Sequence, residues 1–228
     1  MVLRLDMLLV SLNLVKSRER AKEMIKQSLI KVDGKIVNKP SVQVDETSAV
    51  QLLGNSLQYV GRGGLKLEKA INVFNLDFLG KVCIDIGAST GGFTDCMLQN
   101  GAKKVYAIDV GHSQLDKKLL DDSRVINLEK TNIREVNDYI FDEKIDFITI
   151  DVSFISLKLV LPKVKEILKN GEFVALIKPQ FEAGKADVGK KGIVKSPKIH
   201  IKVLEEIVQL VGINFAVKAL DFSPISGG

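Results

Sequence analysis

The sequence predicts a doubly wound α/β domain with a mainly parallel sheet, preceded by a small α+β unit. From residue 81 onward, short apolar segments typical of buried strands alternate with segments of helical periodicity. A glycine-rich stretch, Asp85-Ile-Gly-Ala-Ser-Thr-Gly-Gly-Phe-Thr-Asp95, follows the first of these strands and opens a helix. The first forty residues hold the whole excess of positive charge, which indicates a separate unit there.

Composition narrows the class of protein. With 228 residues the chain can hold a small and a medium-sized domain. No apolar run is long enough to span a membrane and the N-terminus lacks a signal-peptide pattern, so we expect a cytoplasmic protein without a membrane partner. Cys83 and Cys96 lack the spacing of metal ligands, so we expect two buried free thiols and no metal site.

Charge is unevenly distributed along the chain. Residues 1–40 contain nine Lys and Arg against four Asp and Glu, whereas the remaining residues contain 24 of each sign. The formal net charge of +5 therefore belongs to the N-terminal unit. This asymmetry points to a polyanionic partner, with a solvated basic face that binds nothing as an equally weighted alternative.

The N-terminal unit is predicted to contain two helices and several short strands. Leucines from Leu3 to Leu12 recur at helical spacing, and Ser17 can cap a second helix over 18–28. Arg18, Lys22 and Lys26 lie four residues apart on that helix, so their charges project from one face. Asp33-Gly34 predicts the turn of a hairpin over 30–37, and apolar residues at 42, 44, 50 and 52 suggest further short strands.

The rest of the chain follows an α/β rhythm after an expected linker over 54–63. Helices are predicted over 64–74, from Phe93, over 113–120, from a cap at Thr131 or Asn132 to about 140, over 156–168, and from Ser196-Pro197 to about 210. Strands are predicted over 81–85, 104–109, 124–128, 146–151, 173–178 and about 214–221.

The glycine-rich stretch is the candidate ligand site. It places backbone N–H groups and a helix N-terminus at the carboxyl edge of the sheet, and its glycines allow a ligand to approach the backbone closely. Asp109 ends the next strand and can accept hydrogen bonds from the ribose of an adenosine ligand. Because Ser89 stands where NAD enzymes have a further glycine, S-adenosylmethionine is favoured over NAD. An ordinary glycine turn without a nucleoside is the remaining alternative.

Two charged residues end neighbouring strands at the same edge. Asp151 ends the predicted strand over 146–151, and Lys178 ends the predicted strand over 173–178. A lysine that closes an apolar strand has few structural reasons to be there. We therefore favour a catalytic pair over a lysine that merely projects to solvent.

The N-terminal unit resembles the S4-type RNA-binding module of a ribosomal protein. The resemblance lies in Arg4-Leu-Asp6, Ser17-Arg18, Val32-Asp-Gly34 and Lys39-Pro40, and it runs through about residue 53. It implies an RNA-binding domain over 1–53 that docks on structured RNA mainly through phosphates. The expected RNA-binding residues are Arg4, Arg18, Arg20, Lys22, Lys26, Arg62 and, in a lysine-rich loop after Lys178, Lys190 and Lys191.

The whole chain resembles the TlyA (hemolysin-A-like) family, whose catalytic half is similar to FtsJ-type ribose 2′-O-methyltransferases. The marks are Tyr59-Val-Gly-Arg-Gly-Gly-Leu-Lys-Leu67, the glycine-rich stretch, Tyr106-Ala-Ile-Asp-Val-Gly111, Glu129-Lys-Thr-Asn132, Asp151-Val-Ser-Phe-Ile-Ser156 and Ile177-Lys-Pro-Gln-Phe-Glu182. The resemblance implies a Rossmann-like S-adenosylmethionine-dependent methyltransferase domain over 64–228. It also implies ribosomal RNA or ribosomal subunits as partner, and a cytidine ribose as acceptor. The expected cofactor-binding residues are Asp85, Gly87, Ser89, Thr90, Gly91, Gly92, Asp109 and Asn132.

The resemblance also implies a catalytic set. Lys66, Asp151 and Lys178 match the first three members of the Lys-Asp-Lys-Glu tetrad of FtsJ-type enzymes. The glutamate would follow a last hairpin that the chain, ending at Gly228, does not reach, so we expect a truncated C-terminal strand. Lys178 is expected to accept the proton of a ribose 2′-hydroxyl, and Asp151 to orient Lys178. The alternatives are a non-catalytic RNA-binding protein with a vestigial nucleoside pocket and a membrane-lytic hemolysin.

Overall fold

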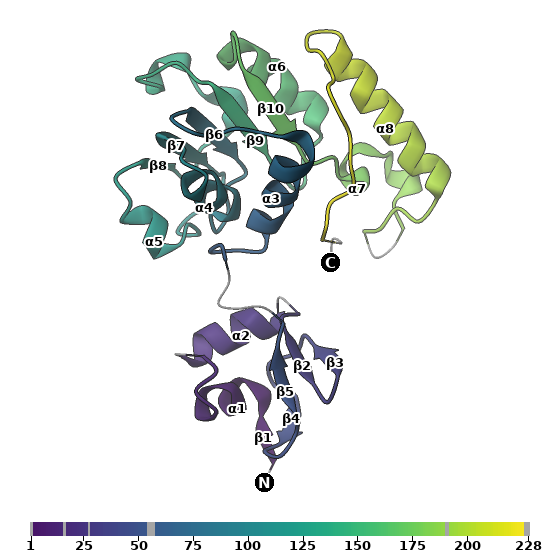
Figure 1. Ribbon diagram of the computed structural model, residues 1–228. Coiled ribbons are helices and arrows are strands. Elements are labelled where there is room, and N and C mark those ends of the chain that lie inside the picture. The colour runs from purple at the N-terminus through teal and green to yellow at the C-terminus, as the bar shows by residue number, and fades with distance from the viewer. Residues whose placement is uncertain (1, 16, 27, 54–57, 190–191, 226–228) are drawn as a thin grey trace. The chain divides into compact units, whose positions relative to one another are not determined.

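The computed structural model in Figure 1 describes the chain except for residues 1, 16, 27, 54–57, 190–191 and 226–228. Its contacts divide it into two compact units, Met1–Gln58 and Tyr59–Gly228. The expected linker, 54–63, spans this boundary. Its residues 54–57 lie outside the described part, whereas Tyr59 and Val60 are buried in the second unit, where the Val60 N–H donates to Asp95 at 2.9 Å.

The first unit is built from two helices against short antiparallel strands. Its elements are β1 (Val2–Arg4), α1 (Leu5–Ser11), α2 (Arg18–Lys26), β2 (Ile30–Val32), β3 (Lys35–Val37), β4 (Gln43–Asp45) and β5 (Val50–Leu52). The order β3-β2-β5 forms one sheet and β1 pairs with β4 in another. Apolar residues of both helices and of the strands form the core, among them Leu5, Leu9, Ile25 and Ile30.

Most of the local expectations for this unit are confirmed. The Ser17 hydroxyl accepts the Arg20 N–H at 3.2 Å, which caps α2 as expected. Asp33 and Gly34 both have positive φ, 49° and 78°, as the two-residue turn of a tight hairpin requires. The helical reading from Leu3 is wrong at its start, because residues 2–4 pair with β4 and α1 begins at Leu5.

The second unit is a parallel sheet covered by helices on both faces. Its strands are β6 (Val82–Ile86), β7 (Lys104–Ile108), β8 (Val125–Leu128), β9 (Phe147–Ile150) and β10 (Glu172–Ala175), in the order β10-β9-β6-β7-β8. All four pairings are parallel, which confirms the doubly wound prediction. The chain runs outward from β6 to β8 and then returns to place β9 on the other side of β6. The reversal between β6 and β9 is the position at which such sheets bind ligands.

The helices of this unit are α3 (Gly63–Phe74), α4 (Gly92–Gln99), α5 (Lys117–Leu120), α6 (Leu157–Ile167), α7 (Pro179–Glu182) and α8 (Pro197–Gly212). Short 3-10 turns occur at Ile133–Glu135, Asp138–Ile140 and Lys185–Asp187. Two expected helices are thus wrong in extent: Asp116 caps α5 and delays its start to Lys117, and the stretch to residue 140 forms two 3-10 turns.

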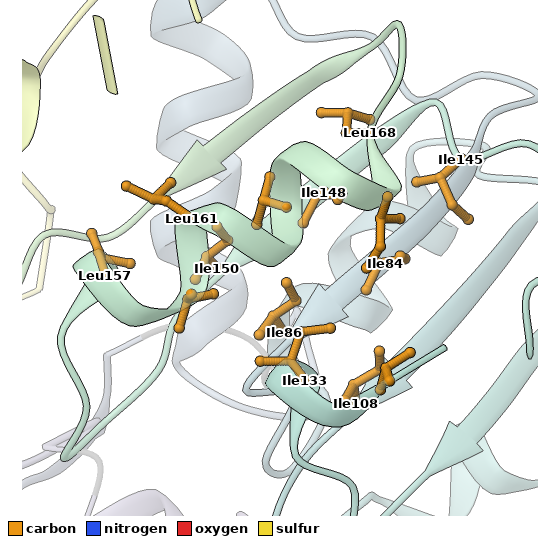
Figure 2. Close-up of a cluster of buried hydrophobic side chains, with 14 of the residues drawn as sticks. Ile84, Ile86, Ile108, Ile133, Ile145, Ile148, Ile150, Leu157, Leu161 and Leu168 are labelled. Atoms are coloured by element: carbon orange, nitrogen blue, oxygen red, sulfur yellow. The ribbon is translucent and has the colours of Figure 1, made fainter. Parts of the chain in front are cut away.

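Strand residues alternate between two cores, as a period of two requires. Ile84 and Ile86 face a cluster that includes Leu157 and Leu161 of α6, shown in Figure 2. Cys83 faces the opposite cluster, which includes residues of α3 and α4. Cys83 and Cys96 are both buried free thiols, as expected.

The strand expected over about 214–221 is wrong. The described residues after α8 form no strand, because none of them makes a ladder pairing with the edge strand β10. Side chains make the contact instead. The Phe215 ring lies 4.9 Å from that of Phe173, and Lys218 forms an ion pair with Glu172.

Candidate active site

A cleft of about 550 Å³ lies at the carboxyl edge of the sheet of the second unit. It has the size of a typical small-ligand site. Five segments line it: the start of α3, the glycine-rich turn after β6, the loop after β9, the loop after β10, and the C-terminal stretch with Ser223 and Ile225. Its lining includes Arg62, Gly63, Lys66, Gly87, Ala88, Ser89, Thr90, Gly92, Phe93, Asp151, Ser153, Lys178 and Phe181.

The glycine-rich turn passes very close to the loop after β9. Gly87 has φ +85°, and a Cβ there would lie 2.7 Å from the carbonyl oxygen of Asp151. Gly91 adopts φ +94° and forms the N-cap of α4. Only residues without a Cβ allow this path, so the turn brings backbone N–H groups and the start of α4 to the cleft.

A second glycine contact brings α3 to the same place. A Cβ on Gly92 would lie 2.8 Å from the backbone nitrogen of Gly64, so α3 and α4 begin almost backbone to backbone. Lys66 lies in the first turn of α3 and therefore reaches the cleft.

The structure brings Lys66, Asp151 and Lys178 together. Lys66 Nζ donates to Asp151 Oδ2 at 2.8 Å, and Lys178 Nζ lies 2.7 Å from Asp151 Oδ1. Lys178 Nζ also donates to Ser153 Oγ at 2.9 Å and lies 5.8 Å from the centroid of the Phe181 ring. One carboxylate thus holds two ammonium groups within the cleft, and Lys66, Asp151 and Lys178 form a triad.

The contact between Lys178 and Asp151 is an ion pair without hydrogen-bond geometry. Among the described buried side-chain atoms, Asp151 Oδ1 is the one that lacks a hydrogen-bond partner. Among the described residues that line the cleft, Asp151 is also the one carboxylate. A buried carboxylate oxygen with unused acceptor capacity suits a site that binds a polar ligand.

Asp85, expected to bind the cofactor, does not line the cleft. It is fully buried, and its carboxyl accepts hydrogen bonds from Thr94 Oγ1 at 2.7 Å and Thr149 Oγ1 at 3.1 Å. Burial raises the pKa of Asp85 to about 6, against the lowering effect of the two threonine hydroxyls. Its geometry supports a role in fastening β6 to α4 and β9 beneath the turn.

Asp109 is held by backbone amides of two loops. Its carboxylate accepts the Ser89 N–H at 2.8 Å and the Gly111 N–H at 2.7 Å. Ser89 itself has φ +49°, in the region that favours glycine. A carboxylate has about four acceptor positions, so Asp109 keeps capacity for ligand hydroxyls while it braces the turn.

Asn132 caps a 3-10 turn. Its side chain accepts the Arg134 N–H at 3.2 Å and donates to Glu135, and it does not line the cleft. The expected turn residues Gly87, Ser89, Thr90 and Gly92 do line the cleft, and so does Arg62, whereas Gly91 and Asp109 do not.

In the first unit, two of the expected RNA-binding residues share one buried acid. Asp6 is fully buried and accepts hydrogen bonds from Arg4 Nε at 2.9 Å and Arg18 Nε at 3.0 Å. These guanidinium groups lower the pKa of Asp6 to about 2. Arg20, Lys22 and Lys26 lie on α2, whereas Lys190 and Lys191 lie outside the described residues.

Sequence reasoning missed an aromatic pair beside the triad. Phe154 is 91% exposed and has φ +64°, and its ring lies 5.2 Å from that of Phe181. The available signal was that Asp151-Val-Ser-Phe154 and Lys178-Pro-Gln-Phe181 repeat the same spacing of charge and phenylalanine after neighbouring strands. An exposed aromatic side chain on a strained backbone is typical of functional sites.

The residues present fit a bound nucleoside such as that of S-adenosylmethionine. The glycine-rich turn lines the cleft, a Cβ at Gly87 would meet the Asp151 backbone beside it, and Asp109 follows the adjacent strand β7. A parallel sheet with a turn and an acid in these two positions is the arrangement that binds adenosine ligands.

No helix in the described part of the chain is both long and apolar enough to cross a bilayer.

Comparison with known proteins places the chain among methyltransferases. Residues 59–228 match the FtsJ-like methyltransferase family, and residues 3–50 match the S4 domain. A Bacillus subtilis protein named as a candidate rRNA methyltransferase is 48% identical over 99% of this chain and 81% of its own length. The 16S/23S rRNA (cytidine-2′-O)-methyltransferase TlyA of Mycobacterium tuberculosis is 39% identical over 87% of this chain and 75% of its own length. A solved structure from Streptococcus thermophilus, named as a candidate hemolysin, is 50% identical with a TM-score of 0.77 and covers 100% of this chain and 84% of that one.

Proposed function

The chain belongs to the FtsJ-like methyltransferase family and carries an S4 domain, and we propose that it methylates the ribose 2′-hydroxyl of a cytidine in ribosomal RNA, with S-adenosylmethionine as methyl donor. The observation that carries this proposal is the convergence of Lys66 and Lys178 on the two oxygens of Asp151 within one cleft. The TlyA relative supports the choice of ribosomal RNA and of cytidine.

The methyl donor would be held by the glycine-rich turn. Gly87, Ser89, Thr90 and Gly92 line the cleft, and Asp109 braces the turn from the next strand. S-adenosylmethionine would supply a methyl group carried on a sulfonium sulfur. The 2′-oxygen would bond to the methyl carbon as the bond between that carbon and the sulfur breaks. Asp85 supports the turn from beneath, as its burial indicates.

The triad would prepare the nucleophile. A ribose hydroxyl is a weak nucleophile until it loses its proton. Lys178 Nζ, in its neutral amine form, is the group proposed to accept that proton and become an ammonium beside Asp151. Asp151 holds Lys178 and Lys66 in place, and Ser153 gives Lys178 a second contact. Orientation of the hydroxyl between these groups supplies a large part of the rate enhancement.

The N-terminal unit would bind the RNA. We assign the RNA-binding domain to residues 1–53 and the methyltransferase domain to residues 64–228. The segment 54–63 joins them, and its residues from Tyr59 onward pack with the second unit. Arg4 and Arg18 keep 37% and 45% of their side chains exposed while Asp6 orients them, so both present charge to phosphates. Arg20, Lys22 and Lys26 add positive charge along α2.

The proposal is tested by methyl transfer from tritiated S-adenosylmethionine to unmodified ribosomal subunits. The labelled ribose is then mapped. The wild-type chain is expected to label a cytidine 2′-hydroxyl. Lys178→Ala and Asp151→Ala should lower turnover by roughly 10² to 10⁴-fold while cofactor binding persists. Lys144→Ala is the matched control, because Lys144 is exposed and does not line the cleft.

The outcomes separate the alternatives. Labelling of a base or of no RNA by a chain that binds the cofactor would contradict the substrate assignment. Near wild-type turnover in Lys178→Ala would contradict the role given to Lys178. Binding of RNA without cofactor binding or methyl transfer would favour a non-catalytic RNA-binding protein.

A further inference from the structure

Glu182 joins the two loops that carry the catalytic pair, although it does not line the cleft. It is the last residue of α7, the short helix that follows Lys178. Its Oε2 accepts a hydrogen bond from Ser156 Oγ at 2.5 Å, and its Oε1 accepts the Leu157 N–H at 2.8 Å. Ser156 and Leu157 begin α6, at the end of the loop that starts with Asp151.

The contact of Glu182 with Ser156 and Leu157 goes beyond what capping of α6 requires. Ser156 is already the local cap of α6, since its Oγ accepts the Lys158 N–H at 3.1 Å. Glu182 adds a charged acceptor with two hydrogen bonds at the positive end of the helix, and such bonds are roughly twice as strong as neutral ones. A carboxylate from a distant segment, bound where a local cap already exists, ties that segment to the helix.

The backbone ladder ends before the catalytic residues. Parallel pairing between β9 and β10 reaches Ile150 and Ala175, and the last backbone bond is from Leu176 N–H to the Ile150 carbonyl at 2.8 Å. Beyond that point the two loops are joined by side chains: Lys178 with Asp151 and Ser153, Phe154 with Phe181, and Glu182 with the start of α6. Among these side-chain contacts, the hydrogen bonds of Glu182 are the ones that lie farthest along both loops from the strand ends.

We propose that Glu182 is a positioning residue that holds the Lys178 loop against the Asp151 loop, so that Lys178 Nζ keeps its place beside Asp151. The inference rests on the catalytic roles proposed above for these two residues. It assigns Glu182 no contact with substrate or cofactor.

Kinetics of Glu182→Ala and Glu182→Gln test the inference. Misplacement of a catalytic group by about 1 Å can cost 10²-fold in rate, so we expect kcat of Glu182→Ala to fall roughly 10- to 100-fold. The KM for S-adenosylmethionine should stay within about threefold, because the glycine-rich turn is untouched. Glu182→Gln should recover much of kcat, since its amide can accept from Leu157 N–H and donate to Ser156 Oγ.

Glu206→Ala is the matched control. Glu206 on α8 accepts a hydrogen bond from Lys158 Nζ at 2.6 Å, so it also fastens the start of α6, but from α8 and not from the Lys178 loop. Its loss should leave kcat unchanged. Equal losses of kcat in Glu206→Ala and Glu182→Ala, or an unchanged kcat in Glu182→Ala, would overturn the inference, and so would a Glu182→Gln variant no better than Glu182→Ala.

A second readout does not depend on activity. Lys178 is 17% exposed beside Asp151, so an amine-specific acylating reagent should modify it slowly in the wild-type chain. Mass spectrometry should show faster modification of Lys178 in Glu182→Ala and wild-type rates in Glu206→Ala. If the wild-type chain labels no RNA, the proposed function fails, and this reactivity still decides whether Glu182 positions Lys178.

Discussion

Replacement of Asp85 by Asn should make the second unit more stable at neutral pH relative to wild type. Asp85 is fully buried. Its carboxyl accepts hydrogen bonds from the Thr94 and Thr149 hydroxyls and from the Thr94 backbone, and it has no counter-ion among the described contacts. Burial raises the pKa of this carboxyl from 3.8 to about 6. The folded state therefore binds the proton of Asp85 more tightly than the unfolded state does.

The size and the pH range of the effect follow from this shift. A difference of about two pKa units corresponds to roughly 3 kcal/mol between the protonation states. Because the folded-state pKa is the higher one, this stability is fully present below about pH 4 and is lost as the pH rises through about 6. At neutral pH the ionised carboxylate is a cost to the fold, and a neutral asparagine amide in its place removes that cost.

Urea unfolding of wild type and Asp85→Asn between pH 4 and pH 8 measures the effect. The free energy of unfolding of the variant minus that of wild type should rise with pH, by up to about 1.4 kcal/mol per pH unit between pH 4 and 6, and then level off. Asp77→Asn is the control, because Asp77 is exposed and accepts one backbone N–H. A difference between wild type and Asp85→Asn that does not change with pH would refute the reasoning.

The same variant separates support of the turn from contact with the cofactor. Since the carboxyl does not line the cleft, Asp85→Asn should bind S-adenosylmethionine within about threefold of the wild-type affinity in calorimetric titration. A loss of more than tenfold in the folded variant would place Asp85 in contact with the cofactor.

Three further outcomes follow from the geometry. Gly87→Ala should lower the free energy of unfolding in urea by roughly 1–3 kcal/mol and weaken cofactor binding, because residue 87 has φ +85° and its Cβ would lie 2.7 Å from the Asp151 carbonyl oxygen. Wild-type stability and affinity in this variant would contradict the close approach. Arg18→Gln should lower the slope of log binding constant against log salt by about 0.7 to 0.9 in filter-binding assays with ribosomal RNA, and an unchanged slope would exclude a phosphate contact. Asp6→Asn should remove a stabilisation that wild type has above about pH 4 and loses as the pH falls towards 2, because two arginines lower the pKa of Asp6. Acid unfolding followed by circular dichroism measures this, and identical curves for the two proteins would argue against it.

The sequence was sufficient to predict the sheet and one edge of the site. Alternation of apolar strands and helices predicts parallel pairing, and parallel pairing places residues that end neighbouring strands at one edge. Asp151 and Lys178 follow β9 and β10, so their proximity could be inferred from local pattern alone. The hairpin at Asp33-Gly34 and the cap at Ser17 were predictable for the same reason, because both depend on neighbouring residues in the chain.

Features that depend on contacts between distant segments were not predictable in this way. Asp85 ends a predicted strand next to glycines, which indicates a ligand contact, but its partners Thr94 and Thr149 come from α4 and β9. The stretch over 214–221 has strand-like composition, yet its side chains reach β10 while its backbone forms no ladder. Propensity could not decide either case, because partners far along the chain determine both.

The position of Lys66 shows how backbone contact assembles the site. Lys66 and Asp151 are 85 positions apart, and no rule of sheet topology brings them together, because Lys66 precedes the first strand of its unit. The start of α3 reaches the cleft because Gly92 lies against Gly64 with no side chain between them. A methyl group at Gly92 would meet backbone atoms, which have less room to yield than a flexible side chain, so α3 would have to move away from α4. The glycines of the turn therefore serve two purposes: they open the backbone to a ligand, and they set the distance at which Lys66 meets Asp151.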